Sequence, residues 1–397
     1  MAATTSAPQP HRLRPGVLAP LCQAQFLAGV VVVTIGPLLL PVMKDFNVPL
    51  SRGGLIAMGF FVGRALGALL LNFLLAHIPV KRTLVVAYVV QAAGLAGAGL
   101  LSHSLWSFFG FYVLVGLAAA MPMTISGMWV SAHVREGTER AMTLVVSFFA
   151  LGMVIAPWVV GALMGTGSNW RWILVGEGGL SLLLALVTAG TRLRDIPRRE
   201  NLRLRQIKEV WGFSPGLLGF IAAAGFLYVG AESTLGVWLP KFEQGLFGSG
   251  AMWAGLTVTS FWIGELIGRL GVIPLLKRFR GPYLVLWFGS LFTVLCVVIA
   301  LSPTQAVSML IVFVAGLAAS AIWPLISGHC SRFPHWHAGV VYSAMVFAGG
   351  LGSISFPYAF GPAAHAFGFR TAMALVALPA AFVTLLAAYV PRTAKRA

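Results

Sequence analysis

Five ionisable residues lie inside long apolar stretches of this chain, where charge is costly: Arg64, Glu177, Glu232, Glu265 and Arg269. A charged side chain at the centre of a bilayer costs roughly 2.5–3.5 kcal/mol on insertion scales, so such residues usually face the protein interior and mark function. The whole chain has only ten acidic residues, and three of them belong to this set. These five residues are therefore the first candidates for chemistry.

Glu265 and Arg269 are four residues apart, which places them on one face of a helix and within pairing distance. They can form a purely structural ion pair. Alternatively, the acid takes up a proton and the freed guanidinium binds a carboxylate or another polar group. Glu232 follows Tyr228 by one helical turn, and removal from water favours the protonated form of an acid. We predict a proton-coupling role for Glu232, Glu265 and Arg269: the acids take up and release the proton, and Arg269 is the partner of Glu265.

Arg64 either attracts an anionic group of a ligand or is a buried structural charge with an acidic or carbonyl partner. Glu177 lies near the end of its apolar stretch and is expected to cap or pair locally. Amide and aromatic side chains complete the candidate site because they can hydrogen-bond to the polar groups of a ligand or stack on a ring. The predicted ligand-binding residues are Gln25, Arg64, Tyr228, Glu232 and Trp323.

The tryptophans allow a second interpretation, since Trp is common where a membrane protein meets the lipid–water interface. Trp170, Trp172 and Trp238 are expected there. Trp129 and Trp323 lie within apolar stretches and could bind a ligand, although packing explains them equally well.

The amino-acid composition indicates that these residues are positioned by segments that span a membrane. Hydrophobic residues make up 58% of the 397 and charged residues 9%, whereas a soluble domain carries roughly 25% charge. Stretches long enough to cross about 30 Å of hydrocarbon can be drawn at 16–42, 52–77, 83–102, 106–132, 140–164, 172–191, 214–240, 250–276, 282–301, 305–328, 338–362 and 369–390.

The two halves of the chain contain the same short sequence motifs about 200 residues apart. Leu151-Gly152, Pro157 and Gly161 return as Leu351-Gly352, Pro357 and Gly361; Gly116 to Ala119 returns as Gly316 to Ala319, and Phe60 to Gly63 is matched by Phe261 to Gly264. Duplicated membrane halves are a recurring transporter architecture, with the solute site between the halves near the midplane. The glycines and prolines also predict close helix packing and bending.

The repeat predicts an all-α membrane protein of twelve transmembrane helices in two six-helix pseudo-repeats. We expect a disordered tail over 1–15, an amino-terminal bundle over 16–191, a basic linker over 192–213, a carboxy-terminal bundle over 214–390 and a tail over 391–397.

The net charge of +17 is distributed unevenly. Twenty Lys and Arg lie in the terminal segments, the linker and alternate loops, against five in the opposite loops. By the positive-inside rule this bias predicts that both termini face the cytoplasm. The basic excess reflects topology and contact with the lipid bilayer, so nucleic acid is not an expected partner.

Twelve helices in a six-plus-six repeat with a basic central loop resemble the major facilitator superfamily across the whole chain. The family usually carries an Asp-Arg-x-Gly motif followed by basic residues in the loop between helices 2 and 3. Here the basic residues Lys81 and Arg82 are present, and the aspartate is not. The segments 226–239 and 261–264 resemble helices 7 and 8 of the fucose and sugar permeases. Pro37 and Met121 stand where the fucose–proton symporters carry carboxylates. The resemblance implies alternating access, with helices 1, 4, 7 and 10 lining the solute site.

These observations predict a secondary transporter of the cell inner membrane that moves a small polar solute, with a sugar-like molecule favoured and proton coupling expected. The alternatives are an exporter of amphipathic compounds, a proton-coupled organic-anion symporter and a non-transporting sensor. An enzyme is not expected, because the sequence has no phosphate-binding loop and no cluster with metal-ligand spacing. We expect no cofactor, no metal and a monomer.

Overall fold

The computed structural model describes residues 15–134, 138–196, 204–279, 281–333 and 335–393. Within these ranges the regular secondary structure is helical. The helices are α1 (Pro15–Asp45), the short η1 (Leu50–Arg52), α2 (Gly54–His77), α3 (Val80–Leu100), α4 (Leu105–His133), α5 (Thr138–Gly165), α6 (Trp170–Gly190), α7 (Leu204–Phe213), α8 (Pro215–Phe247), α9 (Ala251–Leu275), α10 (Gly281–Leu301), α11 (Gln305–Ala319), α12 (Ile322–Ser327), the short η2 (Gly328–Arg332), α13 (His335–Phe367), α14 (Phe369–Leu375) and α15 (Ala377–Thr393).

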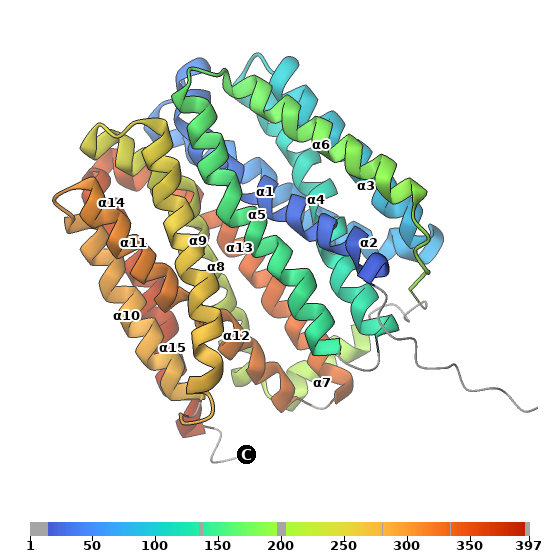
Figure 1. The fold of residues 1–397 in the computed structure, drawn as a ribbon. Coiled ribbons are helices and arrows are strands. Elements are labelled where there is room, and N and C mark those ends of the chain that lie inside the picture. The colour runs from blue at the N-terminus through green and yellow to red at the C-terminus, as the bar shows by residue number, and fades with distance from the viewer. Residues whose placement is uncertain (1–14, 135–137, 197–203, 280, 334, 394–397) are drawn as a thin grey trace, which may run out of the picture.

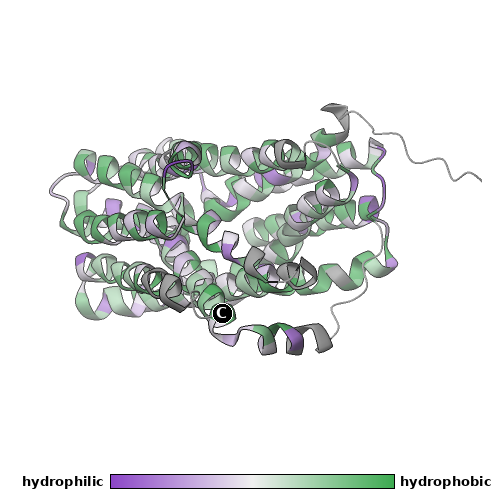
Figure 2. Ribbon diagram, turned by 90° about the horizontal axis from the view of Figure 1, so that it is seen from below, coloured by the Kyte–Doolittle hydropathy of each residue, from purple (hydrophilic) through white to green (hydrophobic). Residues whose placement is uncertain are grey.

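The helices form two groups, α1 to α6 in the first half of the chain and α8 to α15 in the second (Figure 1). In the second group the tenth span is interrupted between α11 and α12, and the twelfth between α14 and α15. Eleven spans among the described residues are long and apolar enough to cross a membrane, and α9, with 25 residues, has a comparable length. The helices are largely apolar when viewed from the end that bears the chain termini (Figure 2). The predicted fold class is confirmed.

The repeated glycines pack helices within each half in the same way. A β-carbon at Gly116 of α4 would overlap the Phe60 carbonyl of α2. A β-carbon at Gly316 of α11 would overlap the Phe261 carbonyl of α9. Both helix pairs therefore approach backbone to backbone, as small residues permit. The prediction of close packing from the repeat is confirmed.

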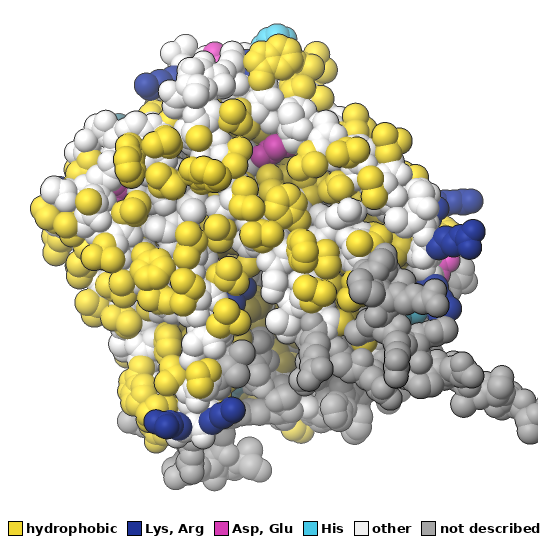
Figure 3. All heavy atoms as spheres, viewed as in Figure 1, with side chains coloured by type: hydrophobic (Ala, Val, Ile, Leu, Met, Phe, Trp, Pro, Cys, Tyr) yellow, Lys and Arg dark blue, Asp and Glu magenta, His cyan; other side chains and the backbone are white. Residues whose placement is uncertain are grey.

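Glycines also join the two halves, toward the end of the bundle opposite the chain termini, which we call the distal end. Gly255 of α9 lies against the Pro157 carbonyl of α5, and Gly54 of α2 lies against the Pro357 carbonyl of α13. Thr259 Oγ1 donates a 2.9 Å hydrogen bond across the halves to a carbonyl of α5. The halves are thus in contact at the distal end. The surface is hollowed between them nearer the terminal end (Figure 3).

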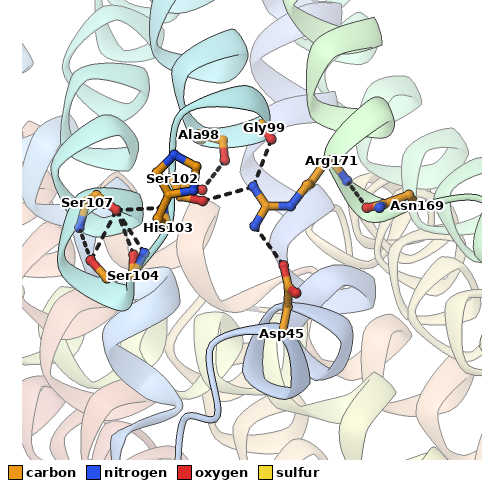
Figure 4. A network of polar contacts seen from close by, with 9 residues as sticks. All are labelled: Asp45, Ala98, Gly99, Ser102, His103, Ser104, Ser107, Asn169 and Arg171. Carbon is orange, nitrogen blue, oxygen red and sulfur yellow. Dashed lines mark hydrogen bonds and ion pairs between the residues drawn. The ribbon is translucent and has the colours of Figure 1, made fainter.

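A network of polar contacts at the distal end fixes three helices of the first half (Figure 4). The Arg171 guanidinium, at the start of α6, forms a 2.8 Å ion pair with Asp45 of α1 and donates to the carbonyls of Gly99 and Ser102, at the end of α3 and just after it. Arg370 repeats the arrangement in the second half by donating to the Ala300 and Ser302 carbonyls. The duplication therefore extends to these anchoring arginines.

Two of the three tryptophans expected at the lipid–water interface are buried. Trp172 is 65% exposed, as an interfacial residue should be, but Trp238 is fully buried. Its indole donates a 2.8 Å hydrogen bond to the Pro357 carbonyl of α13. Trp170 is buried as well, beneath the Arg171 guanidinium. These two rings pack helices, and the interfacial interpretation was wrong for them.

Candidate functional site

A tyrosine and an acid one turn apart on α8 form the first part of the site. The Tyr228 hydroxyl lies 3.0 Å from Glu232 Oε1 and 3.1 Å from the Ala319 carbonyl oxygen. A hydroxyl has one hydrogen to donate, so it cannot serve both acceptors fully. Both contacts are satisfied when Glu232 carries a proton, donates it to Tyr228 Oη, and leaves the tyrosine hydrogen for Ala319. The geometry therefore favours a protonated Glu232.

The pair on α9 adjoins this acid. Glu265 is buried and forms an ion pair with Arg269, whose side chain is 35% exposed. The carboxyl groups of Glu232 and Glu265 are close enough to interact electrostatically. Two neighbouring carboxylates repel each other when both are ionised, which favours a proton on one of them. The structure thus brings the three residues predicted to couple transport to protons into one cluster.

Arg64 faces this cluster from the other half. Its place in the repeat is the place of Glu265, since Phe60 to Gly63 matches Phe261 to Gly264 and the next residue is Arg64 in one half and Glu265 in the other. Arg64 is half-buried, lies 5.6 Å from the centre of the Phe61 ring and interacts electrostatically with Glu232. Among the described residues, no acidic group lies within ion-pair distance of Arg64.

A break in the tenth span supplies the backbone acceptor. Ala319 is the last residue of α11, and α12 resumes at Ile322. Pro324 lacks the N–H that a regular helix would direct to the Ser320 carbonyl, which is consistent with the break. Irregular backbone at membrane depth is tolerated where protein groups satisfy it. Here the Tyr228 hydroxyl contacts the Ala319 carbonyl.

Two other candidates are placed differently from each other. The Trp323 ring lies 6.3 Å from the Tyr228 ring, centroid to centroid, so it adjoins the cluster. Gln25 is buried, and its amide nitrogen donates to the Met123 carbonyl of α4. Trp129 donates to the Arg194 carbonyl in the linker. For Gln25 a role in solute binding stays a prediction, and the visible contacts of Trp129 are structural.

The local pairing expected for Glu177 was wrong. Its Oε1 accepts a 2.5 Å hydrogen bond from Thr34 of α1, 143 residues away in the chain. A second buried acid was missed: Glu243 of α8 accepts a 2.5 Å bond from Ser308 of α11. Glu243 lies just past the predicted stretch 214–240, and a longer estimate of that span would have included it.

Metal ligation receives no support from the described ranges. No group of three or more His, Cys, Asp or Glu is placed there to hold a metal ion.

The sequence model of the Major Facilitator Superfamily matches residues 21–357. The chain belongs to this family. It is therefore an integral membrane protein with the fold of secondary transporters, which move small solutes and are not enzymes. A curated relative, a protein TsgA homolog of Edwardsiella ictaluri, is 23% identical over 300 residues, which cover 75% of each chain.

Solved structures show the same fold at low sequence identity. A structure of the nucleoside transporter NupG superposes with a TM-score of 0.79 at 13% identity, covering 94% of this chain and 99% of that one. A structure of the E. coli fucose:proton symporter FucP superposes with a TM-score of 0.64 at 18% identity, covering 94% and 98%. The resemblance to the superfamily is thus confirmed.

Proposed function

We propose that this superfamily member is a proton-coupled symporter that moves a small polar solute, with a sugar-like molecule favoured, across the inner membrane by alternating access. The observation that carries the proposal is the Tyr228 hydroxyl, which contacts both Glu232 and the Ala319 carbonyl and so favours a proton on Glu232, beside the Glu265–Arg269 ion pair. Two similar structures are described as a nucleoside transporter and a fucose:proton symporter. Both descriptions favour a polar, hydroxylated solute.

In this proposal the proton is held by Glu232, whose Oε1 lies 3.0 Å from the Tyr228 hydroxyl. Arg269 keeps Glu265 ionised through their ion pair. When the proton leaves, Glu232 becomes a carboxylate that attracts Arg64 across the halves, in line with their electrostatic interaction. Proton binding therefore changes how strongly the two halves attract each other at the site.

The solute would bind between the halves, beside Tyr228 and Trp323. Contact at the distal end leaves access from the terminal end, and the solute would leave or enter there in this conformation. With both termini in the cytoplasm, as the charge bias predicts, this is the inward-facing state. We further propose a monomer driven by the proton gradient without a cofactor.

Uptake by purified protein in liposomes under an imposed pH gradient tests the coupling. We expect Glu232→Gln to abolish accumulation driven by the gradient while solute exchange at equal pH persists, because glutamine mimics the protonated acid and cannot release a proton. Glu243→Gln is the matched control on the same helix, since its partner is Ser308, outside the site. The proposal fails if Glu232→Gln and Glu265→Gln both retain gradient-driven accumulation.

A further inference from the structure

We propose, building on proton symport as set out above, that the solute is a monoanion: a hydroxylated carboxylate of the sugar-acid class whose carboxylate is bound by Arg64.

The argument begins with the partners of the two arginines. Arg269 has an acid one turn away on its own helix, Glu265, and pairs with it. The residue that corresponds to Arg269 in the first half is Ala68, four residues after Arg64. The first half therefore supplies a single cation at the position where the second half has a complete ion pair. A guanidinium at membrane depth is costly without a counter-charge, and Arg64 has no such partner within ion-pair distance among the described residues.

The net charge of the cluster shows in which protonation state Arg64 needs a counter-charge. Arginine stays protonated in proteins, so Arg64 and Arg269 contribute two positive charges. With Glu232 and Glu265 both ionised the site is neutral. The contacts of the Tyr228 hydroxyl with Glu232 and with the Ala319 carbonyl favour one bound proton, and this proton leaves the site with a net charge of +1. A monoanion next to Arg64 restores neutrality.

Neutrality also explains why the proton and the solute would travel together. Moving a net charge through a low-dielectric interior is unfavourable. The empty, unprotonated site is neutral, and so is the site with one proton and one monoanion. The site with a proton alone carries +1, and the site with an anion alone carries −1. Only the first two states can change conformation without exposing net charge to the apolar interior, which couples the two species one to one.

Two donors on the face of α9 that carries Glu265 favour a solute with hydroxyl groups. Arg269 Nε and Trp262 Nε1 are buried on α9 and donate no hydrogen bond among the described residues. Trp323 adds an aromatic face beside Tyr228. The oxygens of a polyol chain can accept hydrogen bonds from such unpaired donors, whereas a plain hydrocarbon chain would leave them unpaired.

Binding to purified full-length protein tests the inference with three probes: D-gluconate, D-glucose and acetate. We expect gluconate to raise the melting temperature by mass action, and glucose and acetate to have much smaller effects. Arg64→Gln should weaken gluconate binding roughly 10- to 100-fold, as expected for loss of a charge-assisted contact, and Arg64→Lys should lose less. The matched control is Arg192→Gln, an arginine of the linker outside the site.

Two measurements, one of pH dependence and one of dependence on membrane potential, distinguish a solute contact of Arg64 from a structural role. Gluconate affinity should fall as pH rises in the wild type, because ionised Glu232 competes for Arg64, and should be independent of pH in Glu232→Gln. Gluconate accumulation driven by the pH gradient should not respond to a membrane potential. For a neutral solute moving with one proton, 100 mV would change the accumulation ratio by roughly 50-fold.

Glucose binding equal to that of gluconate, or gluconate binding unaffected in Arg64→Gln, overturns the anion assignment. Proton symport would then stand if glucose accumulation remains driven by the pH gradient. An absence of gluconate binding also overturns the assignment. Loss of the proton gradient's effect on every probe would instead refute the proposed function itself.

Discussion

Replacing Glu265 by glutamine tests the ion pair on which the cluster depends. Removal of one partner from a fully buried pair costs about 3–5 kcal/mol, because the remaining charge is left uncompensated. Here the exposed fraction is 4% for the Glu265 side chain but 35% for Arg269, so solvent screens part of that charge. We therefore expect Glu265→Gln to lower the free energy of unfolding by about 1–3 kcal/mol.

The loss should depend on pH with a definite sign. At low pH Glu232 is protonated and cannot replace Glu265 as the counter-charge of Arg269. As pH rises, Glu232 ionises beside Arg269 and takes over part of the lost attraction. The destabilisation caused by Glu265→Gln should consequently be largest at acidic pH and shrink toward alkaline pH.

Thermal unfolding of the detergent-purified protein, followed at mildly acidic and mildly alkaline pH, measures both effects. The double variant Glu265→Gln/Arg269→Gln removes both charges and should recover most of the lost stability. A melting temperature of Glu265→Gln equal to that of the wild type at acidic pH would refute the reasoning. So would a double variant no more stable than the single one.

Three further predictions rest on contacts outside the cluster. The Thr34 hydroxyl lies 3.0 Å from a carbonyl of its own helix and 2.5 Å from Glu177. Because one hydrogen cannot serve both acceptors, Glu177 should be protonated. Glu177→Gln should therefore keep the wild-type melting temperature, whereas Thr34→Val should lower it. Trp238→Phe leaves the Pro357 carbonyl without its donor and should cost about 1–3 kcal/mol, seen as a lower melting temperature; an unchanged value would mean that water replaces the indole. Gly255→Val should force α5 and α9 apart at the distal end, measured as a longer distance between spin labels on the two helices, and an unchanged distance would show that the contact tolerates a side chain.

Local spacing predicted much of the site. An i, i+4 relation determines which side chains meet on one helix, and it identified both the Tyr228–Glu232 contact and the Glu265–Arg269 pair before any tertiary information. The apolar stretches likewise located the spans, because hydrocarbon thickness sets their length. These features depend on neighbouring residues in the chain.

Contacts between helices were not accessible in the same way. The bond from Thr34 to Glu177 depends on how α1 and α6 are rotated against each other, and rotation is set by packing over the whole half. The same holds for the buried position of Trp238 beneath α13. The break after Ala319 was also not predicted. The helix α4, which corresponds to this span in the first half, contains Pro122 and is nevertheless continuous, so a proline in the sequence does not by itself indicate a break. A proline permits an interruption, and the surrounding contacts decide whether one forms.

The equivalence of Arg64 and Glu265 has a consequence for the ancestry of the chain. If the two halves descend from one six-helix ancestor that assembled as a symmetric dimer, each position on one subunit was mirrored by the identical residue on the other. A basic or acidic residue at this place would then have been present twice in the site, and like charges repel in a low-dielectric interior. Opposite charges at this place became possible only after gene fusion freed each copy to change independently. The polarity of the site is thus younger than the fold that contains it.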